Sequence, residues 1–307
     1  MQTNGFLILP RAVEVYQAQS SMYNVSMNLF TPFGVSEFLP DAALRHNKLT
    51  QQIAKYFEIA GFSPIRTPVV EYFDALAVGL DPHLVSQSIR FFDTSGHMMI
   101  LRPDHTTPIA RMVASRLSKT PIPLQFYYVA PVFRNTTTDS PMELFQAGVE
   151  WIGVTGPQSD AQLIQQCVRL LSQLGFTDLG VDIGHPALAD GLSTADRDAL
   201  VHHDYVRLGR LPERGTIEVA RHIPELVALD TELRALNLHE TVRYNTGLIR
   251  EFEYYTGPHF EVYANGIRQM VACGGRYDRL ISKFGYDCPA VGFALNLSLI
   301  QEALAQC

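Results

Sequence analysis

The segment formed by residues 123–154 constrains the fold more than any other part of the chain. Residues 123–133 are rich in Tyr, Phe and Val, a composition typical of a buried strand. A polar segment with a proline covers residues 134–143, and residues 144–154 then return to an apolar pattern. Because a short connection joins strands that run in opposite directions, we expect a long antiparallel hairpin. The pattern therefore predicts a fold with an antiparallel sheet at its centre.

The patterns around this hairpin predict further helices and strands. An amphipathic helix opens at Pro40-Asp41 with Leu44, Leu49, Ile53 and Phe57 at helical spacing, and it stops at Gly61. The other predicted helices are 107–117, 158–174, 277–284 and a terminal one, and the other predicted strands are 63–70, a hairpin over 91–101, 178–183, 242–249, 259–264, 268–273 and 290–295. Residues 186–240 form a mostly helical insertion, and residues 1–31 carry no assignable pattern. Strands in hairpins with helices around them predict an α+β fold, an antiparallel sheet flanked by helices.

Composition narrows the class of protein. The chain has 307 residues, of which 47% are hydrophobic and 18% charged, as in ordinary globular proteins. Its net charge of −7 argues against a tRNA-binding surface, which needs clustered Lys and Arg. No apolar run approaches the roughly 20 residues of a membrane span, so we expect a cytoplasmic protein without a membrane partner. Its four cysteines lack metal-ligand spacing, which predicts free thiols and no metal site.

Seven segments carry a specific pattern. Near the end of the sequence stand Gly274-Gly275-Arg276-Tyr277-Asp278 and Gly292-Phe293-Ala294. The other five, in chain order, are 61–71, 101–106, 133–134, 146–150 and 248–257. Together they resemble the catalytic core of histidine-tRNA synthetases, which are class II aminoacyl-tRNA ligases. The resemblance covers about residues 32–300 and implies a class II synthetase-like fold with no resident cofactor. It also implies that the anticodon-binding domain of those enzymes is absent here.

The resemblance assigns a histidine site. Its residues are Asp104, Thr106, Arg134, Gln146, Glu150, Arg250, Tyr254 and Tyr255. In the family the acid and the Thr hold the amino group, the first Arg neutralises the carboxylate, and the tyrosines contact the imidazole. Taken without the resemblance, the same residues are compatible with structural roles. Asp and Thr at a helix start are often N-caps. The side chains of Gln146 and Glu150 share one face of a strand, where either a ligand or an internal hydrogen-bond network can satisfy them.

The positions that bind ATP in the resembling enzymes differ here. Thr136 replaces the Glu that contacts adenine, Phe145 replaces a His, and Glu251 replaces a Gly. Leu299 replaces the Arg that holds the nucleotide. The resemblance therefore implies a chain that binds histidine and does not activate it with ATP.

This combination resembles the regulatory subunits of ATP phosphoribosyltransferase. That resemblance implies a subunit without activity of its own, which takes L-histidine as effector. It implies a homodimer within a hetero-octamer, bound to a short catalytic subunit that it activates and feedback-inhibits in the first step of histidine biosynthesis. It implies no tRNA partner. Two alternatives stay open: a histidine-tRNA ligase with a divergent ATP site, and a stand-alone histidine-binding paralogue.

Overall fold

The computed structural model describes residues 31–32, 34–135, 141–202, 204–249 and 255–306. Contacts between Cα atoms divide the chain into Met1–Phe33 and Gly34–Cys307, and every described helix and strand belongs to the second unit. Four residues singled out in the sequence, Thr136, Arg250, Glu251 and Tyr254, lie outside the described residues.

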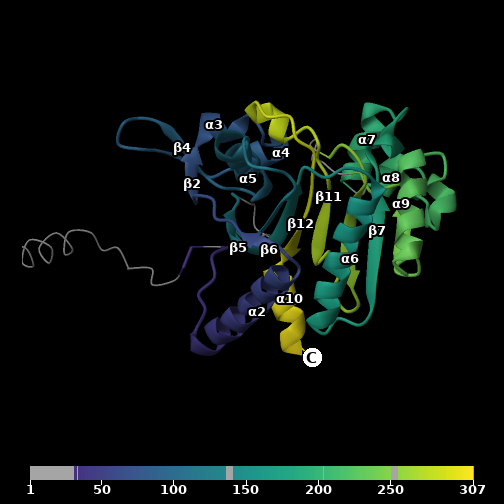
Figure 1. The fold of residues 1–307 in the computed structure, drawn as a ribbon, viewed down its shortest axis with the longest axis horizontal. Coiled ribbons are helices and arrows are strands. Elements are labelled where there is room, and N and C mark those ends of the chain that lie inside the picture. Colours follow the sequence, from purple (N-terminus) through teal and green to yellow (C-terminus); the bar gives the residue numbers. More distant parts are fainter. Residues whose placement is uncertain (1–30, 33, 136–140, 203, 250–254, 307) are drawn as a thin grey trace, which may run out of the picture. The chain divides into compact units, whose positions relative to one another are not determined.

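The second unit is built on a nine-stranded sheet (Figure 1). Its strands, in spatial order, are β1 (Ser63–Pro64), β5 (Leu124–Phe133), β6 (Glu143–Ile152), β12 (Ala290–Asn296), β11 (Ala272–Arg276), β10 (His259–Ala264), β7 (Leu179–Gly184), β9 (Val242–Asn245) and β8 (Arg214–Gly215). Neighbours are antiparallel except β1–β5 and β7–β9. Strands β5 and β6 form the predicted long hairpin, with Tyr128 opposite Gly148. The prediction of an antiparallel α+β fold is confirmed.

A smaller sheet has the order β2 (Val70–Tyr72), β4 (Met98–Leu101), β3 (Arg90–Phe92), and all its pairs are antiparallel. The antiparallel pairing of β3 with β4 confirms the predicted hairpin over 91–101. In its turn, one Asp93 oxygen accepts from the backbone N–H groups of Ser95 and His97 at 2.9 and 2.8 Å. The predicted single strand 63–70 is wrong. It is divided between the two sheets, because Pro64 and Pro68 lack the N–H groups that a continuous ladder needs.

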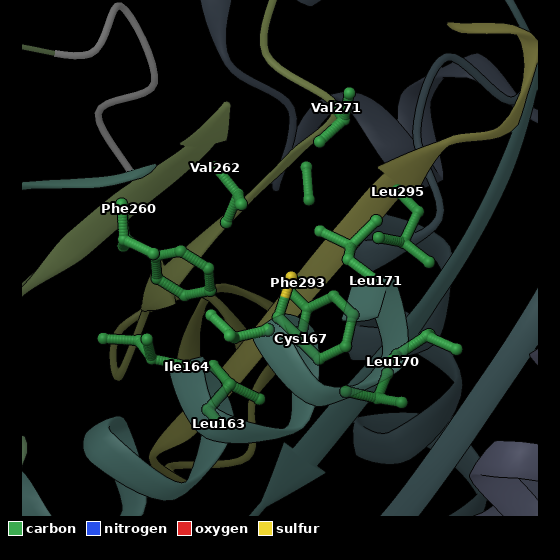
Figure 2. Packing of buried hydrophobic residues seen from close by; sticks show 14 of the residues in the cluster. Leu163, Ile164, Cys167, Leu170, Leu171, Phe260, Val262, Val271, Phe293 and Leu295 are labelled. Atoms are coloured by element: carbon green, nitrogen blue, oxygen red, sulfur yellow. The ribbon is translucent and has the colours of Figure 1, made fainter. Parts of the chain in front are cut away.

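One face of the large sheet is covered by α2 (Pro40–Ile59), α6 (Pro157–Gln173) and α10 (Leu297–Gln306). Helices α2 and α6 follow their predicted bounds closely, although Leu44, expected on the apolar face of α2, is 54% exposed. Figure 2 shows the core of this face, where Leu163, Ile164 and Cys167 of α6 pack near side chains from β10 and β12. This apolar core lies on one face of the large sheet.

The other face is covered near β5 and β6 by α5 (Thr106–Met112), its continuation η1 (Val113–Leu117) and the 3₁₀-helix η4 (Ile281–Phe284). Side chains alternate along β5, so Tyr127 belongs to the first core and Tyr128 to the second. Two short helices, α3 (Phe73–Ala77) and α4 (Pro82–Ser86), lie near the small sheet (Figure 1). Polar side chains of the candidate site lie on this second face.

The segment between β7 and β9 is mostly helical, as predicted. It contains η2 (Pro186–Ala189), α7 (Thr194–Val201), α8 (Tyr205–Leu208), β8, η3 (Ile217–Ala220) and α9 (Pro224–Ala235). The parallel pair β7–β9 joins both ends of this segment to the large sheet.

Three predicted elements near the end of the chain have different bounds. The strand predicted at 242–249 ends at Asn245, and the one predicted at 268–273 is β11, Ala272–Arg276. The helix predicted at 277–284 is only the 3₁₀-helix η4 at its end, and before it the Asp278 N–H donates to the Thr256 hydroxyl at 2.9 Å. Among the described residues, no helix combines the length and the apolar character needed to cross a bilayer.

Candidate ligand site

Five of the eight residues assigned to the site in the sequence line one pocket: Asp104, Thr106, Arg134, Gln146 and Tyr255. They come from the start of α5, the segment after β5, strand β6 and the segment before β10. Glu150 contacts this group from behind, while Arg250 and Tyr254 fall in the part of the chain that is not described. We call this cavity the Asp104 pocket.

The Asp104 carboxyl group has two different roles for its two oxygens. Oδ2 accepts from the Thr107 hydroxyl at 2.8 Å and from the Thr107 backbone N–H at 3.4 Å, in the first turn of α5, whose N-cap residue is His105. Oδ1 is buried and has no hydrogen-bond partner among the described residues. Burial raises the pKa of Asp104 to about 6, against the opposing effects of the Thr107 bonds and the Arg134 charge. Neither Asp104 nor Thr106 is therefore the N-cap residue of α5, and one oxygen of the buried Asp104 carboxyl lacks a partner from the described chain.

Arg134 supplies positive charge to the same pocket. Its Nε donates to the Pro103 carbonyl at 2.9 Å, which fixes the guanidinium next to the loop that carries Asp104. A pocket with one carboxylate and one guanidinium is complementary to a ligand that carries both an ammonium and a carboxylate.

Glu150 lies behind the pocket wall and is only 1% exposed. Its Oε1 accepts from the Thr106 hydroxyl at 2.8 Å, and its Oε2 pairs with the Tyr277 hydroxyl. The sequence allowed either a ligand or an internal network to satisfy Glu150, and an internal network accounts for both of its oxygens. Burial raises its pKa to about 8; the bonds from Tyr277 and Thr106 oppose this shift, and the charge of Asp104 adds to it.

We expect Glu150→Gln to change how stability depends on pH. The pKa of Glu150 rises from an ordinary 4.5 to about 8 on folding, so its contribution is fully present below pH 4.5 and is lost as pH rises through 8. Between about pH 6.5 and 8, the free energy of unfolding should fall by about 1–2 kcal/mol more in the wild type than in the variant. Urea unfolding at several pH values measures this difference. This pH window lies above the raised pKa values of Asp104 and Asp160, both about 6. Parallel plots of unfolding free energy against pH for the wild type and the variant would contradict the raised pKa of Glu150.

Close approach of strands in the site requires glycine at two positions. A Cβ on Gly148 would lie 2.6 Å from Cζ of Tyr128, whose ring crosses strand β6 there. A Cβ on Gly292 would lie 2.8 Å from the Glu150 carboxyl carbon. Both glycines stand in the sequence motifs, but the sequence does not reveal the side chains that require them. Sequence reasoning did not assign several lining residues to the site, among them Leu84, His105, Tyr128, Cys273 and Tyr277, because their tertiary neighbours are not visible in the sequence.

The two described residues at the positions that bind ATP in the resembling enzymes lie outside the Asp104 pocket. The Phe145 ring packs against Phe38 and His46, with ring centroids 5.5 and 4.7 Å away. Leu299 lines a separate pocket formed by the turn after α6, the turn between β10 and β11, and α10. Neither side chain offers a charge to a phosphate.

Metal-binding chemistry has little support in the described residues. There, no group of three or more His, Cys, Asp or Glu side chains is placed to hold a metal ion. Cys167, Cys273 and Cys288 are free thiols.

Comparison with known proteins identifies the family. A family model described as histidyl-tRNA synthetase matches residues 34–205 and 207–300. An ATP phosphoribosyltransferase regulatory subunit from Geobacter metallireducens is 31% identical over 89% of this chain and 73% of its own length. One from Syntrophotalea carbinolica is 33% identical over 89% and 74%. The crystal structure of an ATP phosphoribosyltransferase regulatory subunit/histidyl-tRNA synthetase from Bacillus halodurans superposes with a TM-score of 0.80, at 28% identity, over 90% of this chain and 83% of that one.

These likenesses confirm the predicted class II synthetase-like fold. The family model spans nearly all of Gly34–Cys307, and the relatives align over most of both sequences. The chain therefore belongs to the histidyl-tRNA synthetase family and, within it, to the ATP phosphoribosyltransferase regulatory subunits.

Proposed function

We propose that this chain binds L-histidine in the Asp104 pocket and thereby regulates a short catalytic ATP phosphoribosyltransferase subunit, without activity of its own. The observation that carries the proposal is the buried Asp104 Oδ1, which lacks a partner among the described residues and shares its pocket with Arg134. A buried acceptor without a hydrogen bond costs about 1–3 kcal/mol, and a ligand ammonium offsets that cost.

The pocket chemistry supports an amino acid as the ligand. The α-ammonium pairs with Asp104, the α-carboxylate pairs with Arg134, and Gln146 and Tyr255 supply further polar contacts. The expected imidazole contacts of Tyr254 and the charge of Arg250 belong to the same proposal. Glu150 orients the hydroxyl groups of Thr106 and Tyr277, which line the Asp104 pocket, through its hydrogen bonds with them.

The side chains at the ATP positions support a regulatory role over a ligase. Amino-acid activation needs cations aimed at the phosphates in the transition state. Phe145 and Leu299 supply none, and Phe145 is packed against other rings. We infer binding of histidine without its adenylation.

Regulation requires that histidine bind two states of the assembly with different affinity. Arg102 links the site to the small sheet: it follows β4 directly, and its guanidinium donates to the carbonyls of Pro131 and Thr67, both at 2.9 Å. Asp104 lies two residues further on. A ligand held by Asp104 therefore acts on elements of both sheets. The proposed assembly is a cytoplasmic hetero-octamer of regulatory and catalytic dimers.

Asp104→Asn should weaken histidine binding by about 10- to 100-fold, because it removes the charge that faces the ammonium, and hydrogen bonds to charged groups contribute about 1.5–3 kcal/mol. The fold should survive, since the amide oxygen can still accept from Thr107. Calorimetric titration measures the affinity. Asp198→Asn, in an exposed pair with Arg207, is the control and should bind histidine normally.

The regulatory step is tested with the short catalytic subunit. Adding this chain should raise the rate of product formation, and histidine should lower it in the mixture. Asp104→Asn should desensitise that inhibition and leave the complex intact on a sizing column. Histidine-dependent exchange between ATP and pyrophosphate by this chain alone would overturn the proposal in favour of a ligase.

A further inference from the structure

Two stacked rings form a wall between two neighbouring pockets. The rings of His105 and Tyr128 lie 4.1 Å apart between centroids, at 28° to each other. Both residues line the Asp104 pocket, and both also line a smaller pocket bounded by Thr67, Arg102 and Ile109. We call the smaller one the Thr67 pocket. The stacked pair is the only pair of residues common to both linings, among the residues described.

The His105 ring is held in one orientation. Its Nε2 lies 3.0 Å from the Ala130 carbonyl oxygen. Because a carbonyl only accepts, Nε2 carries the proton and Nδ1 is left as an acceptor. Burial, followed by the nearby charge of Arg102, lowers the pKa of His105 to about 3, so the ring is neutral at physiological pH. His105 is only 2% exposed, so its neighbours enclose the ring.

We propose that His105 is a specificity-determining residue of the site, which with Tyr128 closes the Asp104 pocket toward the Thr67 pocket and so limits the size of the ligand side chain. This inference rests on the proposed function. The admitted ligands are α-amino acids with a side chain no larger than an unsubstituted imidazole. Loss of the His105 ring joins the two pockets and gives room to ring-substituted histidines.

The surroundings of the wall support a steric role. On the far side, the Thr67 carbonyl and the Arg102 guanidinium already bond to each other at 2.9 Å, so they are engaged before any ligand arrives. Ile65 and Ile109 add apolar surface to the same pocket. Arg66 also lines this pocket, so the Thr67 pocket offers an added methyl group space and apolar contact beside a second arginine.

The test compares L-histidine with its two ring N-methyl derivatives by calorimetry, in the wild type and in His105→Ala. The wild type should prefer histidine over each methylated form by at least tenfold. In the variant this ratio should fall at least tenfold for one of the two derivatives, through tighter binding of the methylated ligand. His105→Phe, which restores a ring against Tyr128, should restore the preference.

Ile109→Ala is the matched control, because Ile109 is 1% exposed and lines only the Thr67 pocket. It enlarges that pocket without opening the wall, so the ratio should not change. Should His105→Ala fail to fold, His105→Asn tests the same ratio with a smaller polar side chain. A preference that stays at the wild-type value in the folded variant would overturn the inference and leave histidine binding standing. Failure of the wild type to bind histidine at all would instead overturn the proposed function.

Discussion

Arg276→Ala should lower the free energy of unfolding by about 3–5 kcal/mol, since it leaves a buried carboxylate without its partner. The Arg276 side chain is 8% exposed and pairs with Asp160 at 2.8 Å. It also donates to the Ser159 hydroxyl at 2.8 Å and to the carbonyls of Val154 and Gly156 at 3.0 and 3.2 Å. One guanidinium thus joins the end of β11 to the start of α6. Urea unfolding measures the change.

Two further variants separate the buried pair from ordinary surface charge. Arg221→Ala removes an exposed pair with Glu218, whose side chains are 74% and 68% exposed, and should change stability by less than about 1 kcal/mol. Arg276→Lys keeps the charge but not the forked geometry, so it should lie between the wild type and Arg276→Ala. Equal effects of Arg276→Ala and Arg221→Ala would contradict the structural role of Arg276.

Gly292→Ala should destabilise the fold by about 1–3 kcal/mol or more and also weaken histidine binding. The added Cβ would collide with a Glu150 oxygen and would lie 2.6 Å from the Val149 carbonyl oxygen, which belongs to the backbone of the neighbouring strand and cannot turn away. The displaced Glu150 carboxyl group would lose its hydrogen bonds with the Thr106 and Tyr277 hydroxyls. Urea unfolding and histidine titration of the same preparation measure both effects.

Gly180→Ala is the matched strand variant. Gly180 lies in β7, and an added Cβ would meet nothing within 4 Å. Its stability should therefore stay the same or rise slightly, because alanine reduces the freedom of the unfolded chain. Loss of stability in both glycine variants would show that strand glycines matter for a reason other than close approach.

The sequence predicted the periodic elements well. Helices α2 and α6 each begin at a proline and end before a glycine that stops them, so local signals decided their bounds. Strands β5 and β6 were equally clear from their apolar composition. The errors cluster where tertiary contacts override local pattern. A helix was predicted to begin at residue 277. Instead, the Tyr277 hydroxyl bonds to the Glu150 carboxyl group, and the Asp278 carboxylate accepts from Arg276.

The site was predictable only through the resemblance. Nothing in the spacing of Asp104, Arg134, Gln146 and Tyr255 shows that these four residues meet in one pocket. The internal partners of Glu150 and the stacked rings of His105 and Tyr128 were not predicted, because they depend on the packing of α5 against β5. Sequence motifs identified most pocket residues, and only the packing assigns their individual tasks.

The position of β12 between β6 and β11 sets the order in which the protein can be completed during synthesis. Residues 290–296 leave the ribosome after every other strand of the large sheet, yet they join its two parts. Until then β6 and β11 each present an open edge, which is where nascent chains pair wrongly and aggregate. Gln146 on β6 and Cys273 on β11 stand on opposite sides of that gap, so the ligand pocket forms only when the gap closes. Histidine bound in this pocket can therefore stabilise the chain only after β12 has been made.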